Sequence, residues 1–518
     1  MGNNAKLIKN NIALISIVLL STIIIIIMST QKINYHIDEL LTYSLSNSTS
    51  YININPGETY DSYGQFQESF LSTSVGTKFD YKNVWRNQAN DVHPPFYYAI
   101  IHTISSFMPG EFSKYIGIGV NILFNALIIL ILYKFTLLLT NNKAIAYITG
   151  LFWAINPGII SDMMFIRMYI MTMFFCLLIS FIHIKYIHSI STKNYKFFLT
   201  LFAVSLAGAL THYYFIVFTF FICSLFVLVL LYRKRFKELF IYICTYLLTI
   251  ITVLIIFPSI YKHILGGGSR GEESIDNLIN MNGYLHSIKF FWNVISKNLF
   301  GGYLLFFVIV ICIAFITNLL RKKRISKVLN NQFLFKIVFL LIACSLYFLL
   351  ISKIAIYSAE RYLQPIFPVV ILIFVSVVFQ SVKLYFSKKV SIFIVCTMLF
   401  LISINGYIKT TSFEYLILNS EKAVEIAEKY SNKNSIYIYD KTWKIPTNYV
   451  ELSHYKSVTF YNMKDLESLY QNTDNSDFVV YIHSKDKLII NSIVKKLPNI
   501  ETYKKLNNYG YCHVYYLE

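Results

Sequence analysis

Long apolar runs alternate with short polar segments over most of this 518-residue chain. A helix that crosses a membrane needs about 20 predominantly apolar residues, and eleven segments come near that length. They centre on residues 12–30, 116–139, 144–160, 163–184, 197–212, 213–232, 238–258, 301–320, 333–353, 362–381 and 390–407. The pattern predicts a polytopic α-helical membrane protein with about 11 transmembrane helices.

The basic residues between these segments predict the orientation of the chain. When the spans are threaded in order, all the dense basic clusters fall on one side. These clusters are Lys185–Lys196, Arg233–Lys237, Arg321–Arg324 and Lys383–Lys389. Because Lys and Arg are enriched in cytoplasmic loops, this side and the N-terminus are expected in the cytoplasm. The odd number of spans then places the C-terminal segment outside. We expect the protein to lie in the cytoplasmic membrane.

The apolar segment Pro94–Met108 is too short for an ordinary span. Counting it as one would reverse every later loop and place the basic clusters outside. We therefore predict an interfacial or re-entrant helix within the first outer loop, residues 30–114. Pro94 and Pro95 suit a helix N-terminus, and short apolar segments are tolerated at membrane depth where protein or water covers them.

The chain changes character after residue 407, the end of the predicted transmembrane domain 1–407. Residues 408–518 hold 14 Lys and 13 acidic residues and lack long apolar runs. The period of apolar residues predicts a helix and three strands. These are a helix over Glu421–Tyr430 and strands over Ser435–Asp440, Phe478–His483 and Cys512–Leu517. Residues 408–518 are therefore expected to form a small extracytoplasmic α/β domain.

The composition excludes an ordinary soluble enzyme and argues against nucleic acid as a partner. Hydrophobic residues make up 56% of the chain and charged residues only 14%, and the mean hydropathy is +0.53. Globular domains carry about 25% charged residues. The formal net charge of +19 comes from clusters between apolar runs. A nucleic-acid groove would need a basic face with interleaved aromatic residues.

Two adjacent carboxylates, Asp38 and Glu39, follow the first predicted span directly. A carboxylate at a water-poor boundary has a raised pKa, which suits a general base that takes a proton from an acceptor hydroxyl. The same pair also suits a solvated helix N-terminus, where Asp caps and Glu in the first turn are favourable. The pair alone favours the capping role.

The segment Asn90–Tyr98 is more specific, because its two prolines fix the backbone near the predicted membrane boundary. Asp91 and His93 lie just before them. A histidine here suits phosphate binding, proton relay or, with a carboxylate, a divalent cation. The alternative is a rigid turn whose polar side chains face water.

Three further residues lie at predicted span ends: Arg167, His212 and Arg361. Arginine near a membrane boundary suits the phosphate of a lipid, through forked hydrogen bonds. For Arg167 the alternatives are a pair with Asp162 or snorkelling to the interface, and for Arg361 a local pair with Glu360. A lone histidine such as His212 is more often a structural group than a ligand.

The outer loop 258–300 contains the glycine-rich segment Gly266–Gly271, which includes Arg270. It lacks the Lys-Ser or Lys-Thr pair of a nucleotide-binding loop and does not follow a strand. We expect a mobile flap over an outward cavity.

Taken together and in this order, the motifs resemble a known family. They are Asp38-Glu39, Asp91-x-His93-Pro94-Pro95-Phe96-Tyr97-Tyr98, Arg167-Met168-Tyr169, Thr211-His212-Tyr213 and Glu360-Arg361-Tyr362-Leu363 with Pro365. Residues 1–407 are similar to bacterial-type membrane glycosyltransferases of the protein-O-mannosyltransferase and aminoarabinose-transferase superfamily, which have the GT-C fold. Phe96 stands where relatives often have Leu.

The resemblance implies an inverting transferase that moves a sugar from a polyprenyl-phosphate donor to a lipid, surface-glycan or protein acceptor on the outer face. It implies Asp38 as catalytic base with Glu39 as its neighbour. The residues that would bind the donor phosphate are Arg167, Arg361 and Arg270. Those that would shape the acceptor side are Asp91, His93, Tyr169 and His212.

Arginines that stabilise a leaving phosphate need no cofactor in principle. Some relatives place a divalent cation near the acidic loop and a histidine. The resemblance thus leaves Asp91, His93 and His212 as candidate metal ligands.

Two other classes of membrane protein compete with the transferase. A transporter or flippase of lipid-linked sugars should show repeated halves and broken helices near the midplane, whereas this sequence shows no internal repeat and gathers its ionisable groups at one boundary. A glycan polymerase or ligase with a diphosphate-linked donor should carry paired arginines in a late outer loop, and the loop 258–300 has only Arg270. The transferase is the favoured interpretation.

Overall fold

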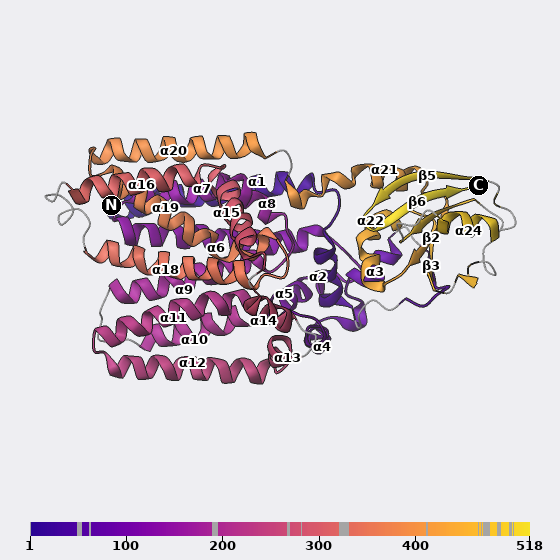
Figure 1. Ribbon diagram of the computed structural model, residues 1–518, viewed down its shortest axis with the longest axis horizontal. Helices are drawn as coiled ribbons and strands as arrows, with labels where there is room; N and C mark the ends of the chain where they lie inside the picture. The colour runs from indigo at the N-terminus through magenta and orange to yellow at the C-terminus, as the bar shows by residue number, and fades with distance from the viewer. Residues whose placement is uncertain are drawn as a thin grey trace.

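A bundle of long helices and a small sheet domain lie end to end in the computed structural model (Figure 1). The described residues are 2–48, 54–61, 64–188, 195–266, 270–280, 282–320, 331–410, 413–464, 466–467, 469, 477–483, 488–496, 500 and 502–518. The basic cluster Arg321–Arg324, part of the cluster Lys185–Lys196 and the centre of the expected glycine-rich flap lie outside them.

The bundle is built from thirteen helices of the described chain. These are α1 (Gly2–Thr30), α6 (Lys114–Thr140), α7 (Lys143–Ile155), α8 (Pro157–Met163), α9 (Tyr169–His188), α10 (Tyr195–Ala209), α11 (Tyr213–Tyr232), α12 (Phe236–Ile256), α15 (Tyr284–Phe300), α16 (Leu304–Leu320), α18 (Asn331–Ile354), α19 (Phe367–Val382) and α20 (Lys388–Lys409). Among described residues, eight helices are long and apolar enough to cross a membrane, or up to ten if each of two bent pairs is one span. Helix α10 is a shorter apolar helix. Each of the eleven predicted segments overlaps one of these elements, and the predicted fold class is confirmed.

The two bent pairs break where the sequence interrupts the helical backbone. Helices α7 and α8 meet at 59°. Pro157 lacks an N–H, and the Asn156 side chain caps α8 by accepting from the N–H groups of Gly158 and Ile159. Helices α15 and α16 meet at 86°, at Gly301 and Gly302, whose φ angles of 56° and 91° favour glycine.

The first outer loop folds against the end of the bundle, beside the sheet domain (Figure 1). It contains β1 (Thr59–Asp61), α2 (Ile37–Asn47), α3 (Gln65–Leu71), α4 (Tyr81–Asn90) and α5 (Phe96–Ser105). Helix α5 starts directly after Pro95, inside the segment predicted as an interfacial helix. It buries Tyr97, Tyr98 and Ile101 and packs on α2 and α4. The loop 258–300 holds α13 (Ile260–Leu265) and α14 (Arg270–Ile279) besides α15.

The C-terminal domain contributes five strands to a six-stranded sheet in the order β1-β3-β2-β4-β6-β5, whose edge strand β1 comes from the first outer loop. Its elements are α21 (Glu421–Lys429), β2 (Asn434–Tyr439), α22 (Tyr449–Leu452), β3 (Ser457–Asn462), β4 (Phe478–Ile482), α24 (Leu488–Lys496), β5 (Tyr503–Tyr509) and β6 (Cys512–Leu517). Strands β3, β2 and β4 are parallel, and β4, β6 and β5 are antiparallel. The predicted helix and three strands correspond to α21, β2, β4 and β6, whereas β3 and β5 were not predicted.

The first outer loop makes strand-pairing and hydrogen-bond contacts with the sheet domain. Strand β1 pairs antiparallel with β3, with Thr59 opposite Thr459. The Asn34 amide donates to Glu451 Oε1 at 2.8 Å, and both side chains are buried. The backbone N–H of Ile33 donates to the carbonyl of Leu416 at 3.3 Å. The sheet domain therefore holds the segment that leads into α2.

Candidate active site

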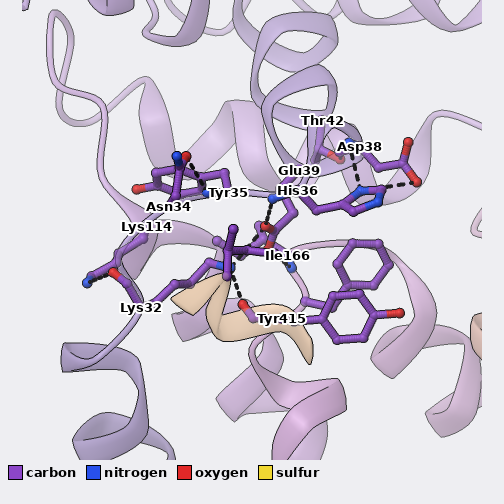
Figure 2. Close-up of polar contacts among 12 residues, drawn as sticks. Lys32, Asn34, Tyr35, His36, Asp38, Glu39, Thr42, Lys114, Ile166 and Tyr415 are labelled. Atoms are coloured by element: carbon purple, nitrogen blue, oxygen red, sulfur yellow. Dashed lines mark hydrogen bonds and ion pairs between the residues drawn. The ribbon is translucent and has the colours of Figure 1, made fainter. Parts of the chain in front are cut away.

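Asp38 lies in the first turn of α2, at the junction of the bundle, the first outer loop and the sheet domain. His36 and Glu39 cap the N-terminus of this helix. The His36 ring accepts from the Asp38 backbone N–H at 3.1 Å, and the Glu39 carboxylate accepts from the His36 backbone N–H at 2.6 Å. This reciprocal arrangement is a capping box. The Asp38 side chain remains 24% exposed, and it points away from the contacts of Glu39 (Figure 2).

Glu39 points into the protein and is fully buried. Its carboxylate accepts from Lys32 Nζ at 3.0 Å and from the backbone N–H of Ile166 at 2.8 Å, besides that of His36 (Figure 2). Burial raises the pKa of Glu39, and the Lys32 ammonium opposes that shift. Glu39 thus joins α2 to the loop between α8 and α9, which carries Arg167.

The Arg167 guanidinium is the centre of a buried polar network and is only 4% exposed. Its Nη1 donates to the Asp38 carbonyl at 3.2 Å, to Thr42 Oγ1 at 2.9 Å and to Tyr98 Oη at 3.0 Å. Its Nη2 lies 3.3 Å from His93 Nε2. No carboxylate lies within ion-pair distance of Arg167 in the described part of the chain. A buried cation with neutral hydrogen-bond partners favours an anionic ligand.

The alternative pairing of Arg167 with Asp162 is not formed. Asp162 instead accepts from Gln364 Nε2 at 2.6 Å. The Arg167 side chain does not snorkel either, because its guanidinium is buried among α2, α5 and His93.

His93 links Arg167 to Asp91. Because a guanidinium can only donate, His93 Nε2 accepts from Arg167 and the ring proton lies on Nδ1, which donates to Asp91 Oδ2 at 3.0 Å. Burial and then Arg167 lower the pKa of His93, although Asp91 opposes them. Burial alone would raise the pKa of Asp91, but its hydrogen bond from His93 holds it below the ordinary value. The neutral imidazole therefore positions Arg167.

Arg361 brings a second guanidinium to Asp38 from the short 3₁₀ helix η2 (Glu360–Tyr362). Its Nη2 lies 3.5 Å from Asp38 Oδ2. The local pair with Glu360 is replaced: Glu360 accepts from Asn298 Nδ2 at 2.8 Å. Burial would raise the pKa of Asp38, but the charges of Arg167 and Arg361 help to hold it below its ordinary value. This is the opposite direction to the shift expected from the sequence.

Aromatic rings lie on one side of the site formed by Asp38, Arg167 and His93. His212 caps α11, with its Nδ1 accepting from the Tyr214 N–H at 3.0 Å. The ring centroid of His212 lies 5.7 Å from that of His93, 5.2 Å from that of Tyr169 and 4.7 Å from that of Tyr214. Burial lowers the pKa of His212 well below its ordinary value. His212 is thus a neutral ring beside His93.

The candidate metal ligands do not fit a divalent cation in this arrangement. Both ring nitrogens of His93 are engaged, one by Asp91 and one by Arg167. His212 Nδ1 accepts from a backbone N–H. Among the residues that the structure describes, no group of three or more His, Cys, Asp and Glu side chains is placed to hold a metal ion.

Arg270 makes its contacts apart from the other two arginines. Its Nη1 donates to Glu273 Oε2 and Tyr357 Oη, both at 2.9 Å. The side chain is 46% exposed. In the described chain, Arg270 forms no hydrogen bond or ion pair with Asp38, Arg167 or Arg361. Its place in donor binding stays a prediction.

Three residues with contacts in this site were not singled out from the sequence: Lys32, Thr42 and Tyr98. Tyr98 lies within the quoted Asp91–Tyr98 motif. Lys32 follows the first span on the side expected to be outside, where basic residues are less common, and this position could have marked it. Thr42 carries no signal of its own, because it belongs to none of the motifs quoted from the sequence.

The fold is similar to that of ArnT from Cupriavidus metallidurans. The crystal structure of that protein bound to undecaprenyl phosphate matches with a TM-score of 0.50 and 11% sequence identity, over 92% of this chain and 96% of that chain. Its apo crystal structure matches with a TM-score of 0.51 and 10% identity, over the same shares. No protein-family model and no curated protein matches this chain.

These findings confirm the predicted resemblance to aminoarabinose transferases at the level of the fold. The chain is a multi-pass membrane protein with an ArnT-like fold and a small C-terminal sheet domain.

Proposed function

We propose that this protein is an inverting glycosyltransferase that uses a polyprenyl-phosphate-linked sugar. The acceptor is a lipid, a surface glycan or a protein, and transfer takes place on the outer face of the cytoplasmic membrane. Residues 1–407 carry the reaction, and residues 408–518 form an outer domain. One observation carries the proposal: the buried Arg167 guanidinium, with no carboxylate partner among the described residues, donates to the Asp38 backbone carbonyl, next to the partly exposed Asp38 carboxylate that Arg361 contacts.

The two guanidinium groups supply the charge that a phosphate needs. Arg167 is fixed by Thr42, Tyr98 and His93, so little side-chain entropy is lost when it binds an anion. Arg361 is 20% exposed, and its Nη2 lies 3.5 Å from Asp38 Oδ2, with the guanidinium 5.6 Å from the centre of the Tyr362 ring, so it can turn toward an arriving phosphate. The ArnT structure bound to undecaprenyl phosphate supports a lipid of this class as the donor.

The chemistry is a single displacement at the anomeric carbon of the donor. Asp38 accepts the proton of an acceptor hydroxyl, and the hydroxyl oxygen attacks the carbon from the face opposite the phosphate. The bond between that carbon and the phosphate oxygen breaks, and polyprenyl phosphate leaves with the electron pair. Arg167 and Arg361 stabilise the negative charge that develops on the leaving group.

Donor binding would also tune the base. In the free protein the surrounding cations lower the pKa of Asp38, which makes it a weak base. A bound phosphate brings negative charge next to Arg167 and Arg361 and so opposes their effect. The Asp38 carboxylate therefore becomes more basic once the donor is in place.

Glu39, Asp91 and His93 are positioning residues in this scheme. Glu39 holds the loop that carries Arg167. Asp91 and His93 form a hydrogen-bonded chain that ends on the Arg167 guanidinium. Tyr169 and His212 supply the adjacent aromatic wall, which suits contact with a sugar ring.

The test is release of polyprenyl phosphate from a panel of polyprenyl-phosphate sugars in membranes that contain the protein. The wild type is compared with Asp38→Asn and with Asp61→Asn, a matched change at an exposed carboxylate of the same loop. We expect one donor to react, Asp38→Asn to be inactive and Asp61→Asn to keep wild-type activity.

Two results would contradict the proposal. Consumption of a diphosphate-linked donor instead would indicate a polymerase or ligase. Movement of labelled lipid-linked sugar across the membrane without release of the carrier would indicate a flippase.

A further inference from the structure

A groove lies at the end of the bundle far from the sheet domain, where α9, α11 and α18 meet. Figure 1 shows these helix ends on the side of the bundle that also holds the N-terminus. The groove has a cavity volume of about 490 Å³. Its walls are mainly apolar and include Leu225, Leu228, Val229, Phe339 and Ile342. Its size and lining suit a hydrocarbon chain.

The groove opens sideways, toward the place that membrane lipid would occupy. Leu228 is 61% exposed, Val338 40% and Ile342 41%. All three lie on helices that are long and apolar enough to cross a membrane. Exposed apolar side chains on such helices face hydrocarbon rather than water, so an occupant enters this groove from the bilayer.

Basic side chains gather at the end of the groove. Lys336 is only 4% exposed, and its Nζ lies 2.7 Å from His188 Nδ1. Arg233 lies at the exposed rim, with its guanidinium 5.8 Å from the centre of the Phe335 ring. All four residues line the groove. A lysine ammonium only donates, so His188 accepts from it and contributes no negative charge.

The protein supplies no carboxylate to balance Lys336 in its described part. Glu238 is the only acidic residue before position 408 on this side of the predicted topology. It pairs with Arg235 and accepts from Tyr186 Oη at 2.7 Å. The sequence of the undescribed segments 189–194 and 321–330 contains no Asp or Glu. A buried ammonium without a counter-charge is costly, and an anionic ligand removes that cost.

We propose that this groove binds an anionic glycerophospholipid, with an acyl chain along the apolar wall and the phosphate between Lys336, His188 and Arg233. The loop charges place this end of the bundle in the cytoplasm, where the membrane leaflet is rich in anionic lipids and basic pockets between helices bind their head groups. The site lies at the opposite end of the bundle from Asp38 and is independent of the proposed transfer reaction.

The experiment uses the purified full-length protein in detergent, with native mass spectrometry to measure bound lipid. Phosphatidylglycerol, phosphatidylcholine, polyprenyl phosphate and inorganic phosphate are titrated separately and in competition. We expect phosphatidylglycerol to bind at least about tenfold more tightly than phosphatidylcholine, since phosphatidylglycerol has a net negative charge, whereas the choline ammonium of phosphatidylcholine cancels the charge of its phosphate. Inorganic phosphate should not displace it.

Two variants at the groove are compared with a matched control. Lys336→Gln and Arg233→Gln should each weaken phosphatidylglycerol binding by about tenfold or more. Arg233 is exposed, so its variant tests the site even if Lys336→Gln fails to fold. Lys389→Gln, at an exposed lysine of α20 outside the groove, should bind like the wild type.

Four results would overturn the assignment. Equal binding of the two phospholipids, or wild-type binding in both groove variants, would exclude a specific anionic site. Polyprenyl phosphate that binds more tightly than phosphatidylglycerol, and is lost in the same variants, would assign the groove to the carrier lipid. Displacement by inorganic phosphate would show a plain phosphate site.

Discussion

Replacement of Glu39 by Gln is expected to destabilise the protein strongly, because Glu39 is half of a fully buried ion pair. Its carboxylate accepts from Lys32 Nζ and from the backbone N–H groups of His36 and Ile166, at 3.0, 2.6 and 2.8 Å. An amide has one acceptor oxygen and leaves the Lys32 ammonium without its counter-charge. Removal of one partner from a buried pair costs about 3–5 kcal/mol. Lys32 keeps its bond to the Tyr415 carbonyl, so we expect about 3 kcal/mol.

The measurement is a double-mutant cycle of unfolding free energies in detergent, by chemical denaturation. The cycle contains wild type, Glu39→Gln, Lys32→Met and the double variant, with Glu111→Gln at an exposed position as the control. The two substitutions should be less harmful together than the sum of their separate effects, by about 2 kcal/mol. Glu111→Gln should stay within about 0.5 kcal/mol of wild type. If Glu39→Gln left stability unchanged but abolished turnover, Glu39 would belong to the chemistry and the positioning role would be refuted.

Three further predictions concern the arginines, the base and the sheet domain. Arg361→Gln should lower kcat about 100-fold, because it removes a donor to the leaving phosphate. Arg270→Gln should change kcat less than about fivefold, since an exposed ion pair contributes at most about 1 kcal/mol. Steady-state kinetics with one donor compare the two variants, and a larger loss of kcat in Arg270→Gln than in Arg361→Gln would contradict the proposed site. Because neighbouring cations outweigh burial and lower the pKa of Asp38, the acid limb of the kcat/KM profile should lie below the ordinary range of an aspartate and move upward in Arg361→Gln. A wild-type acid limb above that range would disprove this. Burial raises the pKa of Glu451 from 4.5 to about 8 in the folded protein. The contribution of protonated Glu451 to the free energy of unfolding is therefore complete below pH 4.5, and this contribution of a few kcal/mol is lost as the pH rises to about 8. Thermal unfolding between pH 4.5 and about pH 8 should show stability falling with pH in the wild type but not in Glu451→Gln. The same fall in Glu451→Gln would mean that other groups cause the pH dependence.

The bundle could be predicted because the signal for a membrane span is local. A run of apolar residues and the charges beside it lie in one stretch of sequence, and each predicted segment overlaps an observed helix. Strand β1 had no such signal. It is three residues long and pairs with β3, with Thr59 and Thr459 separated by 400 positions. Strand β5 (Tyr503–Tyr509) contains two lysines and two asparagines and lacks an apolar alternation.

The sequence predicted which motifs form the site, but not the directions and contacts of their side chains. Neighbouring residues of a helix point about 100° apart, and the sequence could not say that Asp38 faces the arginines while Glu39 faces Lys32. The pKa of Asp38 was expected to rise because only burial was visible in the sequence. The direction reverses because Arg167 and Arg361, far away along the chain, lie beside it in the fold.

The central claim is that Asp38 acts in the chemical step and not in donor binding. The most direct test is single-turnover release of polyprenyl phosphate by the reconstituted protein, with donor binding measured in the same preparation. The account predicts that Asp38→Asn slows release by about 100-fold or more and leaves donor affinity close to that of the wild type. Release within about threefold of wild type, or a loss of donor affinity that explains the whole defect, would contradict it.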